Sequence, residues 1–358
     1  MDRPNLTDSL FHRLPKVELH RHLEGSVRLQ TLREIIRHNS DEEGLPSLEQ
    51  IGQMVQVSPA DRLTSANFLA KFMTLRSFYL SAEIIRQIAY ESVIDAAGEG
   101  VRYLELRFTP TSLARRKGFP LGEVIDWVCE SCRRASEETG IVSRLIISLN
   151  RHDSVELAEQ VVRLAVDKAD KGIVGIDLAG NEADFPVEPF IGLLREACQD
   201  GLQLTIHAGE WGGAQNVRQA ILDLGARRIG HGVRVMEDPS VAALAREREV
   251  VFEVCPSSNY ASGVVASLKE HPLPAMMAAG LKFTLNTDDP AICGITLGNE
   301  YAVANQIFGI SIEPLIQSIW TGLEAGFLKA DEKSRLRQHL RSEMAAFERE
   351  RKRTCTSW

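Results

Sequence analysis

Four histidines stand in short patterns that could bind a metal ion. His20 and His22 form an H-x-H pair in VELHRHLEGS, His207 lies in HAGE, and His231 lies in RIGHGV. Side chains alternate along an extended strand, so both histidines of H-x-H project to the same side. A carboxylate such as Asp288 in LNTDDP would complete a nitrogen-rich set of ligands with one oxygen, which suits Zn²⁺. These residue types predict a metal site.

Hydrolysis is the chemistry that such a site supports. A bound divalent ion lowers the pKa of its water to about 7, so hydroxide forms at neutral pH without a strong base. Glu210 follows His207 by three residues and is placed to exchange protons with a substrate, while His231 could orient the water or take its proton. Two alternatives stay open: Glu210 as a solvent-facing residue at a helix start, and His231 as a fourth metal ligand.

Other motifs point away from competing chemistries. Cys129 and Cys132 form a CxxC on an amphipathic helix without a second pair or nearby histidine, which favours structural thiols. No GxxxxGK[ST], GxGxxG or GxSxG pattern occurs, which argues against phosphate loops and a serine nucleophile. The remaining histidines are expected to lie at the surface or to serve as packing residues: His12, His38, His152, His271 and His339.

Eight short β-rich runs must position these residues. Most are continuously apolar, as in parallel strands buried on both faces, and helix-period segments separate them. Eight alternating units favour an α/β fold of the (β/α)₈ TIM barrel type over a doubly wound sheet, which would show a Gly-rich first turn. The runs are residues 17–20, 101–108, 142–149, 173–178, 202–207, 228–231, 250–254 and 281–286. The histidine motifs end several of them and so converge at one barrel mouth.

Extra helices are expected around this barrel. Residues 26–98 hold about three helical stretches between the first and second runs. An insertion after strand one sits at the carboxyl end, where barrel active sites lie, so it could act as a lid; a bundle that only packs on the barrel is the alternative. Residues 312–353 are predicted as a helical C-terminal tail, and residues 1–358 as one hydrolase barrel domain.

The composition of the chain argues against some classes of binding partner. The 358 residues carry 41 Lys plus Arg against 49 Asp plus Glu, a net charge of −8, so nucleic-acid binding through bulk charge is not expected. No signal-peptide pattern and no run of about 18 apolar residues occurs, so no membrane partner is expected. Six cysteines are too sparse for a disulfide scaffold. We therefore expect a cytoplasmic protein.

Six motifs, in this order, resemble the adenosine deaminase family of metal-dependent amidohydrolases: VELHRHLEGS, GIDLAGNE, HAGEWGG, RIGHGV, EVCPSSN and LNTDDP. The resemblance spans nearly the whole chain. It implies one Zn²⁺ per chain, held by His20, His22, His207 and Asp288. It also implies hydrolytic deamination of adenosine or 2′-deoxyadenosine to the inosine product and ammonia, in purine salvage, by addition of zinc hydroxide to C6 of the purine.

The resemblance assigns further roles. Glu210 would protonate purine N1, and His231 would assist the attacking water. The resemblance thus implies Glu210, His231 and Asp288 as the catalytic residues. Asp289 would hydrogen-bond purine N7, while the backbone N–H of Gly180 would face N3. Ser258 would support the carboxylate ligand from outside the ligand set.

Glu24 departs from the family pattern at the ribose end. Typical adenosine deaminases carry Asp after HRHL, where it contacts the ribose 5′-hydroxyl. One extra methylene moves the carboxylate by about one carbon–carbon bond, and hydrogen-bond distances tolerate only a few tenths of an ångström. Family members that accept a 5′-modified adenosine such as aminodeoxyfutalosine, and those that take free adenine, are similar to this sequence in carrying Glu there. The resemblance therefore implies these as alternative substrates. Gly230 in RIGHGV, where the adenine-specific branch has Asp, favours a nucleoside.

The expected partner is thus a small purine nucleoside, and the sequence does not indicate the oligomeric state. A family member that has lost catalysis and serves as a binding protein is the alternative from another class. The complete set of ligand and proton-transfer residues argues against it.

Overall fold

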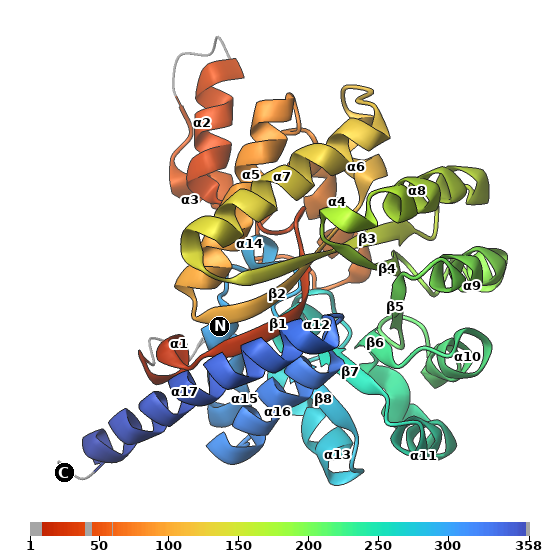
Figure 1. Ribbon diagram of the computed structural model, residues 1–358. Helices are drawn as coiled ribbons and strands as arrows, with labels where there is room; N and C mark the ends of the chain where they lie inside the picture. The colour runs from red at the N-terminus through yellow and green to blue at the C-terminus, as the bar shows by residue number, and fades with distance from the viewer. Residues whose placement is uncertain (1–8, 40–44, 59, 356–358) are drawn as a thin grey trace.

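The computed structural model describes residues 9–39, 45–58 and 60–355. Eight strands form one sheet in chain order, and all neighbouring pairs are parallel (Figure 1). Helices surround the sheet, so the prediction of a (β/α)₈ barrel is confirmed. The strands are β1 (Lys16–His22), β2 (Val101–Phe108), β3 (Val142–Asn150), β4 (Ile173–Ala179), β5 (Gln203–Ala208), β6 (Arg228–His231), β7 (Val251–Val254) and β8 (Lys282–Leu285).

The strand ends agree closely with the apolar runs in the sequence. β2 and β6 have the predicted bounds. β1 continues two residues beyond the prediction, so His22 lies within the strand rather than after it. Because β1 is extended up to that point, His20 and His22 both project from the same face.

The barrel is nearly closed, and its seam lies at the candidate site. β1 and β8 are joined by a bridge between Arg21 and Asp288. The backbone N–H of His22 donates to the carbonyl of Asp288 at 2.8 Å, and the N–H of Asp288 donates to the carbonyl of His20 at 3.0 Å. Asp288 has a φ of +61°. The backbone of the predicted ligands therefore closes the barrel.

The insertion between β1 and β2 contains four helices in its described part, one more than the sequence pattern indicates. They are α2 (Leu29–Asn39), α3 (Leu48–Val55), α4 (Ser65–Arg76) and α5 (Ala82–Gly98). α3 has only eight residues, and two turns offer too few positions to show a helical period. Capping side chains start these helices instead: Ser47 accepts from the N–H of Gln50, and Thr64 accepts from that of Asn67.

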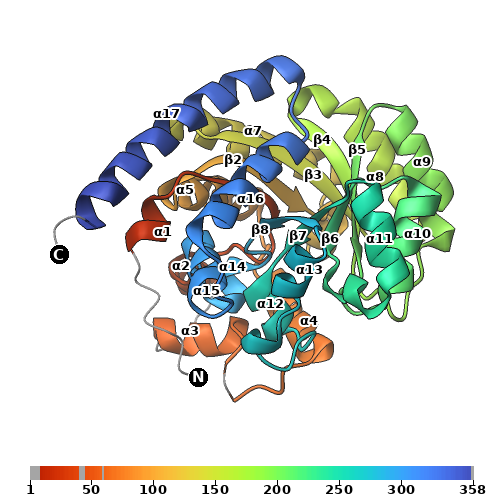
Figure 2. The same ribbon diagram turned by 90° about the horizontal axis from the view of Figure 1, so that it is seen from below.

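The remaining helices cover the outside of the barrel (Figure 2). The predicted helical tail is two helices. The longer helices are α7 (Leu121–Thr139), α8 (Val155–Asp167), α9 (Ile191–Gln199), α10 (Ala214–Leu224), α11 (Pro239–Glu247), α15 (Leu297–Gln306), α16 (Ile312–Ala325) and α17 (Ala330–Cys355). The short ones are α1 (Ser9–Arg13), α6 (Pro110–Arg115), α12 (Pro256–Ala261), α13 (Leu273–Ala278), α14 (Pro290–Cys293), η1 (Ala169–Lys171), η2 (Glu188–Phe190), η3 (Val233–Glu237) and η4 (Leu268–Glu270).

Charged side chains are buried among the strands. Arg107 donates to Asp177 at 3.2 Å and to Glu253 at 2.7 Å. Arg228 donates to the other oxygen of Glu253 at 2.7 Å and to Glu105 at 2.6 Å. All five are at most 2% exposed. Buried charges are tolerated only when they are paired, so this set acts as one unit, the buried ion network.

Two further observations concern the described residues. Cys129 and Cys132 are buried thiols on α7, and burial raises the pKa of Cys129 to about 12, which suits structural thiols. No helix in the described ranges combines the length and the apolar character that a bilayer span needs.

Candidate metal and substrate site

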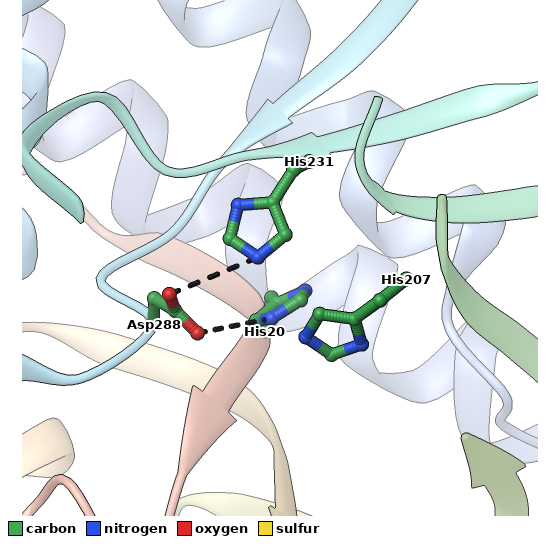
Figure 3. Close-up of side chains that lie close together, drawn as sticks. All are labelled: His20, His207, His231 and Asp288. Carbon is green, nitrogen blue, oxygen red and sulfur yellow. Dashed lines mark ion pairs between the residues drawn. The ribbon is translucent and has the colours of Figure 1, made fainter. Parts of the chain in front are cut away.

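Four buried side chains converge at the carboxyl ends of the strands. His20 comes from β1, His207 from β5, His231 from β6, and Asp288 follows β8 (Figure 3). One potential ligand atom from each lies within 4.8 Å of all the others. His22 adds a ring nitrogen, because its Nε2 lies 3.3 Å from Nε2 of His207 and 3.3 Å from Oδ1 of Asp288. The structure thus brings together all the side chains that the sequence predicts here.

The buried ion network orients two of these histidines. Nδ1 of His20 lies 2.8 Å from Glu253, and Nδ1 of His207 lies 3.0 Å from Asp177. A carboxylate partner holds the ring proton on Nδ1, so Nε2 keeps its lone pair and faces the centre of the group. Nε2 of His20 has no hydrogen-bond partner among the described residues and lies 3.1 Å from Asp288. Imidazole nitrogens and one carboxylate in this arrangement fit a divalent ion such as Zn²⁺.

Asp288 is held as a carboxylate. Burial raises the pKa of Asp288, but the neighbouring His231 and His20 lower it by more than burial raises it. The pKa of Asp288 therefore lies well below its usual value. Ser258 donates its hydroxyl to Oδ2 of Asp288 at 2.7 Å. The arrangement agrees with the predicted supporting contact of Ser258.

Gly230 makes room for a histidine. A Cβ atom at this position would lie 2.8 Å from Cε1 of His20, closer than real Cβ contacts allow. The glycine of RIGHGV, which sequence analysis connects with substrate preference, therefore also has a packing reason. Any larger residue would move the His20 ring.

A hydrogen-bond chain fixes the tautomer of His231. The backbone N–H of Leu273 donates to Nδ1 of His271 at 3.1 Å, so the His271 proton is on Nε2, 3.2 Å from Oδ1 of Asn259. The amide nitrogen of Asn259 then donates to Nδ1 of His231 at 3.1 Å. Neutral His231 consequently carries its proton on Nε2. His271 is a buried packing residue, as predicted, but its hydrogen bond also connects it to the site.

His231 and Glu210 face each other. Nε2 of His231 lies 3.7 Å from Glu210 and 3.7 Å from Asp288. Burial holds the pKa of His231 well below its usual value, so the ring is neutral. A protonated Nε2 cannot bind a metal ion, and this favours a proton-transfer or orienting role over that of a fourth ligand.

Glu210 is 4% exposed and does not face solvent. Burial raises its pKa well above the usual value, and the charges of Asp288 and Glu182 raise it further. The carboxylate of Glu182 accepts from the backbone N–H groups of Gly209 at 3.0 Å and Gly212 at 2.9 Å, as well as from that of Glu210. The HAGEWGG loop is therefore wrapped around Glu182, which aims Glu210 into the site.

The predicted substrate contacts line one cavity of about 510 Å³ together with the site described above. Glu24, Gly180 and Asp289 all contribute to its wall. Asp289 is 2% exposed, and within the described ranges its Oδ1 has no hydrogen-bond partner. Burial raises the pKa of Asp289 well above its usual value, and the charge of Asp288 adds to the shift. A Cβ atom on Gly25 would lie 1.9 Å from Oδ1 of Asp289, so this position of the HLEG motif requires glycine.

Glu24 is fixed at one end only. It is 3% exposed, and its Oε1 accepts from the backbone N–H of Thr109 at 2.7 Å. Oε2 has no partner in the described part of the chain. The second oxygen is left for a ligand.

The insertion supplies an outer wall of this cavity. α4 contributes Phe68, Leu69, Phe72, Met73 and Arg76 to the lining. α4 therefore lies beside the cavity, and its role as a lid remains a prediction.

Sequence reasoning misses the residues behind the site. Asp177 and Glu253 orient the histidine ligands, Asn259 and His271 orient His231, and Glu182 holds the loop. A signal for the first two exists in the sequence: each is a single acid inside an otherwise apolar strand, IVGIDLA or VFEV. Burying such a charge is costly unless it has a partner, so it indicates a buried network.

A parallel (β/α)₈ barrel with histidines and a carboxylate at its carboxyl rim defines an amidohydrolase-type enzyme. The family described as adenosine deaminase matches residues 15–343. An adenosine deaminase of Enterococcus faecalis is 36% identical over 335 residues, which cover 94% of this chain and 98% of that protein. The chain belongs to the adenosine deaminase family, and it is an aminohydrolase that acts on 6-aminopurines.

Two solved structures share the whole fold. An amidohydrolase from Burkholderia ambifaria with bound zinc is 28% identical with a TM-score of 0.85, covering 96% of this chain and 94% of that one. An adenine deaminase from Arthrobacter aurescens is 26% identical with a TM-score of 0.83, covering 92% and 98%. Both an adenosine deaminase and an adenine deaminase are among these relatives, so the family does not define the sugar end of the ligand.

Proposed function

We propose that this protein catalyses the zinc-dependent hydrolytic deamination of adenosine or 2′-deoxyadenosine to the inosine product and ammonia. One observation carries the proposal: the buried carboxyl of Glu210 and the Nε2 of His231 face the same cavity as the predicted ligands. A proton donor beside a nucleophile site is what addition to a purine ring requires.

We assign His20, His22, His207 and Asp288 as the ligands of one Zn²⁺ per chain. Their donor atoms are imidazole Nε2 and carboxylate oxygen, whereas Nε2 of His231 carries a proton. The likeness to an amidohydrolase with bound zinc supports the choice of metal. When bound, the ion lowers the pKa of a water molecule and so makes it a nucleophile at neutral pH.

The residues of the chain then divide the proton transfers. Glu210, kept protonated by burial, gives its proton to purine N1, which makes C6 more electrophilic. His231 directs its Nε2–H at the attacking oxygen and orients it. Asp288, kept ionised, takes a proton from the water and passes it to the amino group, which leaves as ammonia. The second water proton restores Glu210, and the product keeps the proton on N1.

Base binding uses the two predicted contacts on the cavity wall. Asp289 is kept protonated by burial, so it donates to the N7 acceptor of the purine. The backbone N–H of Gly180 faces N3. The apolar side chains of α4 cover the purine and exclude water, which strengthens the polar contacts.

Free adenine is the second candidate substrate, because the likeness to an adenine deaminase favours it. Gly230 is required by the packing of His20, so its presence does not decide between a base and a nucleoside. We place the reaction in cytoplasmic purine salvage. The free thiols of the described residues suit a reducing compartment.

The test is kcat/KM of the zinc-loaded protein on adenosine, 2′-deoxyadenosine and adenine, with ammonia release followed in parallel. The proposal expects a nucleoside to exceed adenine by at least about tenfold. A preference for adenine would replace it with the second candidate. Absence of ammonia from all three would overturn it. The Glu210→Gln variant, prepared in the same way, controls for a contaminating deaminase.

A further inference from the structure

One short helix carries two of the side chains that orient the site. Ser258 lies on α12, which follows β7, and donates its hydroxyl to Oδ2 of Asp288 at 2.7 Å. The next residue, Asn259, donates to Nδ1 of His231 at 3.1 Å. A displacement of α12 would therefore disturb a predicted metal ligand and a predicted proton-transfer residue at the same time.

The N-terminus of α12 is not capped by its own residues. The first N–H groups of a helix have no partner within the helix. At α12 the side chain of the N-cap residue, Cys255, makes no capping hydrogen bond, and Pro256 has no N–H to donate. The backbone N–H of Ser257 donates instead to Oε2 of Glu300 at 3.1 Å. A carboxyl group from another helix thus takes the place of the missing cap.

Glu300 is a buried acid on α15 that the proposed mechanism does not use. It is fully buried and does not line the cavity. Its Oε1 has no hydrogen-bond partner in the part of the chain that the structure describes. Burial raises the pKa of Glu300 to about 8, and the charges of Glu18 and Asp288 add to the shift, so the carboxyl is largely neutral at pH 7. Burying a polar group costs stability, so packing alone does not explain an acid at this position.

The helix that carries Glu300 is tied to the strand of the metal ligands. The backbone N–H of Leu297, the first residue of α15, donates to the buried carboxylate of Glu99 at 2.7 Å. Glu99 also accepts from Arg21 at 3.0 Å, and Arg21 lies between the two histidines of β1. Glu300 follows Leu297 by three residues, so it is held on a support that is anchored beside these ligands.

We infer that Glu300 is a positioning residue of the site, which acts through α12 on Asp288 and His231. By accepting a hydrogen bond from Ser257, it holds the start of α12 in place. The two side chains that this helix presents to the site then keep their contacts with the carboxylate and the imidazole ring. The inference rests on the proposed function and assigns a role in it to a residue outside the cavity.

Three variants test the role of the acceptor. Glu300→Met fills a similar volume without an acceptor for the N–H of Ser257. Glu300→Gln keeps an acceptor oxygen and matches the neutral carboxyl in size. Tyr301→Phe is the matched control, because Tyr301 is buried on the same helix and its hydroxyl hydrogen-bonds to Ser318 on α16. The control thus removes a buried hydrogen bond of α15 that does not involve α12.

The kinetic measurement uses zinc-saturated protein and the best substrate of the wild type among adenosine, 2′-deoxyadenosine and adenine. In Glu300→Met, kcat should fall by about tenfold or more, the scale for losing a partner that orients a functional group. KM should change by less than about twofold, because the base contacts are not altered. Glu300→Gln should recover most of the loss, and Tyr301→Phe should keep the kcat of the wild type.

A spectroscopic measurement does not depend on activity. Nitrogen-15 NMR of the histidine rings in metal-free protein reports which nitrogen of His231 carries the proton, and a His231→Gln variant assigns the resonances. In the wild type the proton should be on Nε2. In Glu300→Met the contact from Asn259 should weaken, so the tautomer with the proton on Nδ1 should become populated. Glu300→Gln and Tyr301→Phe should resemble the wild type.

The inference is overturned if kcat of Glu300→Met stays near the wild-type value, or if its His231 resonances do not change. Equal losses of kcat in Glu300→Met and Tyr301→Phe would show a general structural role, and equal losses in Glu300→Met and Glu300→Gln would show that the acceptor is not what matters. Either result also overturns it.

Two further outcomes leave the test decisive. If Glu300→Met does not fold, Glu300→Asp takes its place, because the shorter side chain withdraws the same carboxyl from Ser257, and the same losses are expected. If the wild type releases ammonia from none of the three substrates, the proposed function fails. The His231 resonances then decide alone whether Glu300 holds α12: a changed tautomer in Glu300→Met supports it, and an unchanged tautomer refutes it.

Discussion

The two ends of the cavity are built differently. At the reaction end, polar side chains that face the donor group have partners behind them: His20 has Glu253, His207 has Asp177 and Asp288 has Ser258. At the sugar end, Oε2 of Glu24 has no partner in the part of the chain that the structure describes. Protein groups hold the predicted metal ligands in place, whereas this oxygen of Glu24, like Oδ1 of Asp289, is left for a ligand.

This difference separates chemistry from specificity. Partners that fix a ring or carboxylate keep the reacting groups in place before substrate arrives. Unpartnered groups cost stability in the free protein and are compensated on binding. The reaction is therefore set by the buried ion network, and the choice of substrate by residues of the insertion and the end of β1.

The largest effect should come from Glu210→Gln. Glutamine keeps the shape but has no acidic proton for purine N1, so kcat should fall by at least about 10²-fold, the usual scale for loss of a general acid. Zinc content should not change, because Glu210 is not an assigned ligand. Steady-state kinetics and metal analysis check both, and turnover near wild type would remove Glu210 from the mechanism.

Asp177→Asn tests the network behind the ligands. The amide no longer holds the His207 proton on Nδ1, and loss of such a partner should weaken zinc binding by about 10–100-fold. Competition with a chelator measures the affinity. Ser148→Ala is the matched control, since Ser148 donates to Asp177 at 3.1 Å without contacting His207. Equal affinities in all three proteins would show that the network does not tune the site.

His271→Phe should have a smaller effect. It removes the donor that orients Asn259 and thereby the tautomer of His231, so kcat should fall by about tenfold, the lower limit for residues that orient a functional histidine. Zinc content should stay constant. His271→Gln retains an N–H donor and should recover part of the loss. Loss of zinc in His271→Phe would instead favour His231 as a ligand.

Glu24→Asp should give the smallest effect, at the sugar end. Shortening the side chain withdraws the carboxylate from Thr109 and brings the residue to the type found in typical adenosine deaminases. Activity on adenosine relative to 5′-substituted adenosines should rise by less than about tenfold. Parallel kcat/KM values provide the ratio, and an unchanged ratio would show that Glu24 does not select the ribose end.

The sequence predicts the barrel well because each strand can be recognised from the residue types of its own short segment. The run 101–108, VRYLELRF, is β-rich on its own although three of its residues are charged, and β2 has those bounds. The pattern of apolar residues does not reveal the short helix α3, because the formation of a helix of eight residues depends on capping and tertiary contacts.

The candidate site likewise has a part that the sequence predicts and a part that it does not. Ligand positions are readable because strand ends share one rim in a parallel barrel, whatever their distance along the chain. The pairings His20–Glu253 and Asn259–His231 are not readable, since they depend on which side chains meet across strands.

The backbone conformation of two site residues has an evolutionary consequence. His231 and Asp288 are two of three non-glycine residues with positive φ in the described ranges, at +58° and +61°. Such a conformation costs roughly 1–3 kcal/mol per residue, and Gly or Asn would relieve much of it. Only selection for catalysis opposes that exchange. In a lineage released from deaminase activity, these two positions should drift to Gly or Asn early, so their identity records whether the enzyme is still in use.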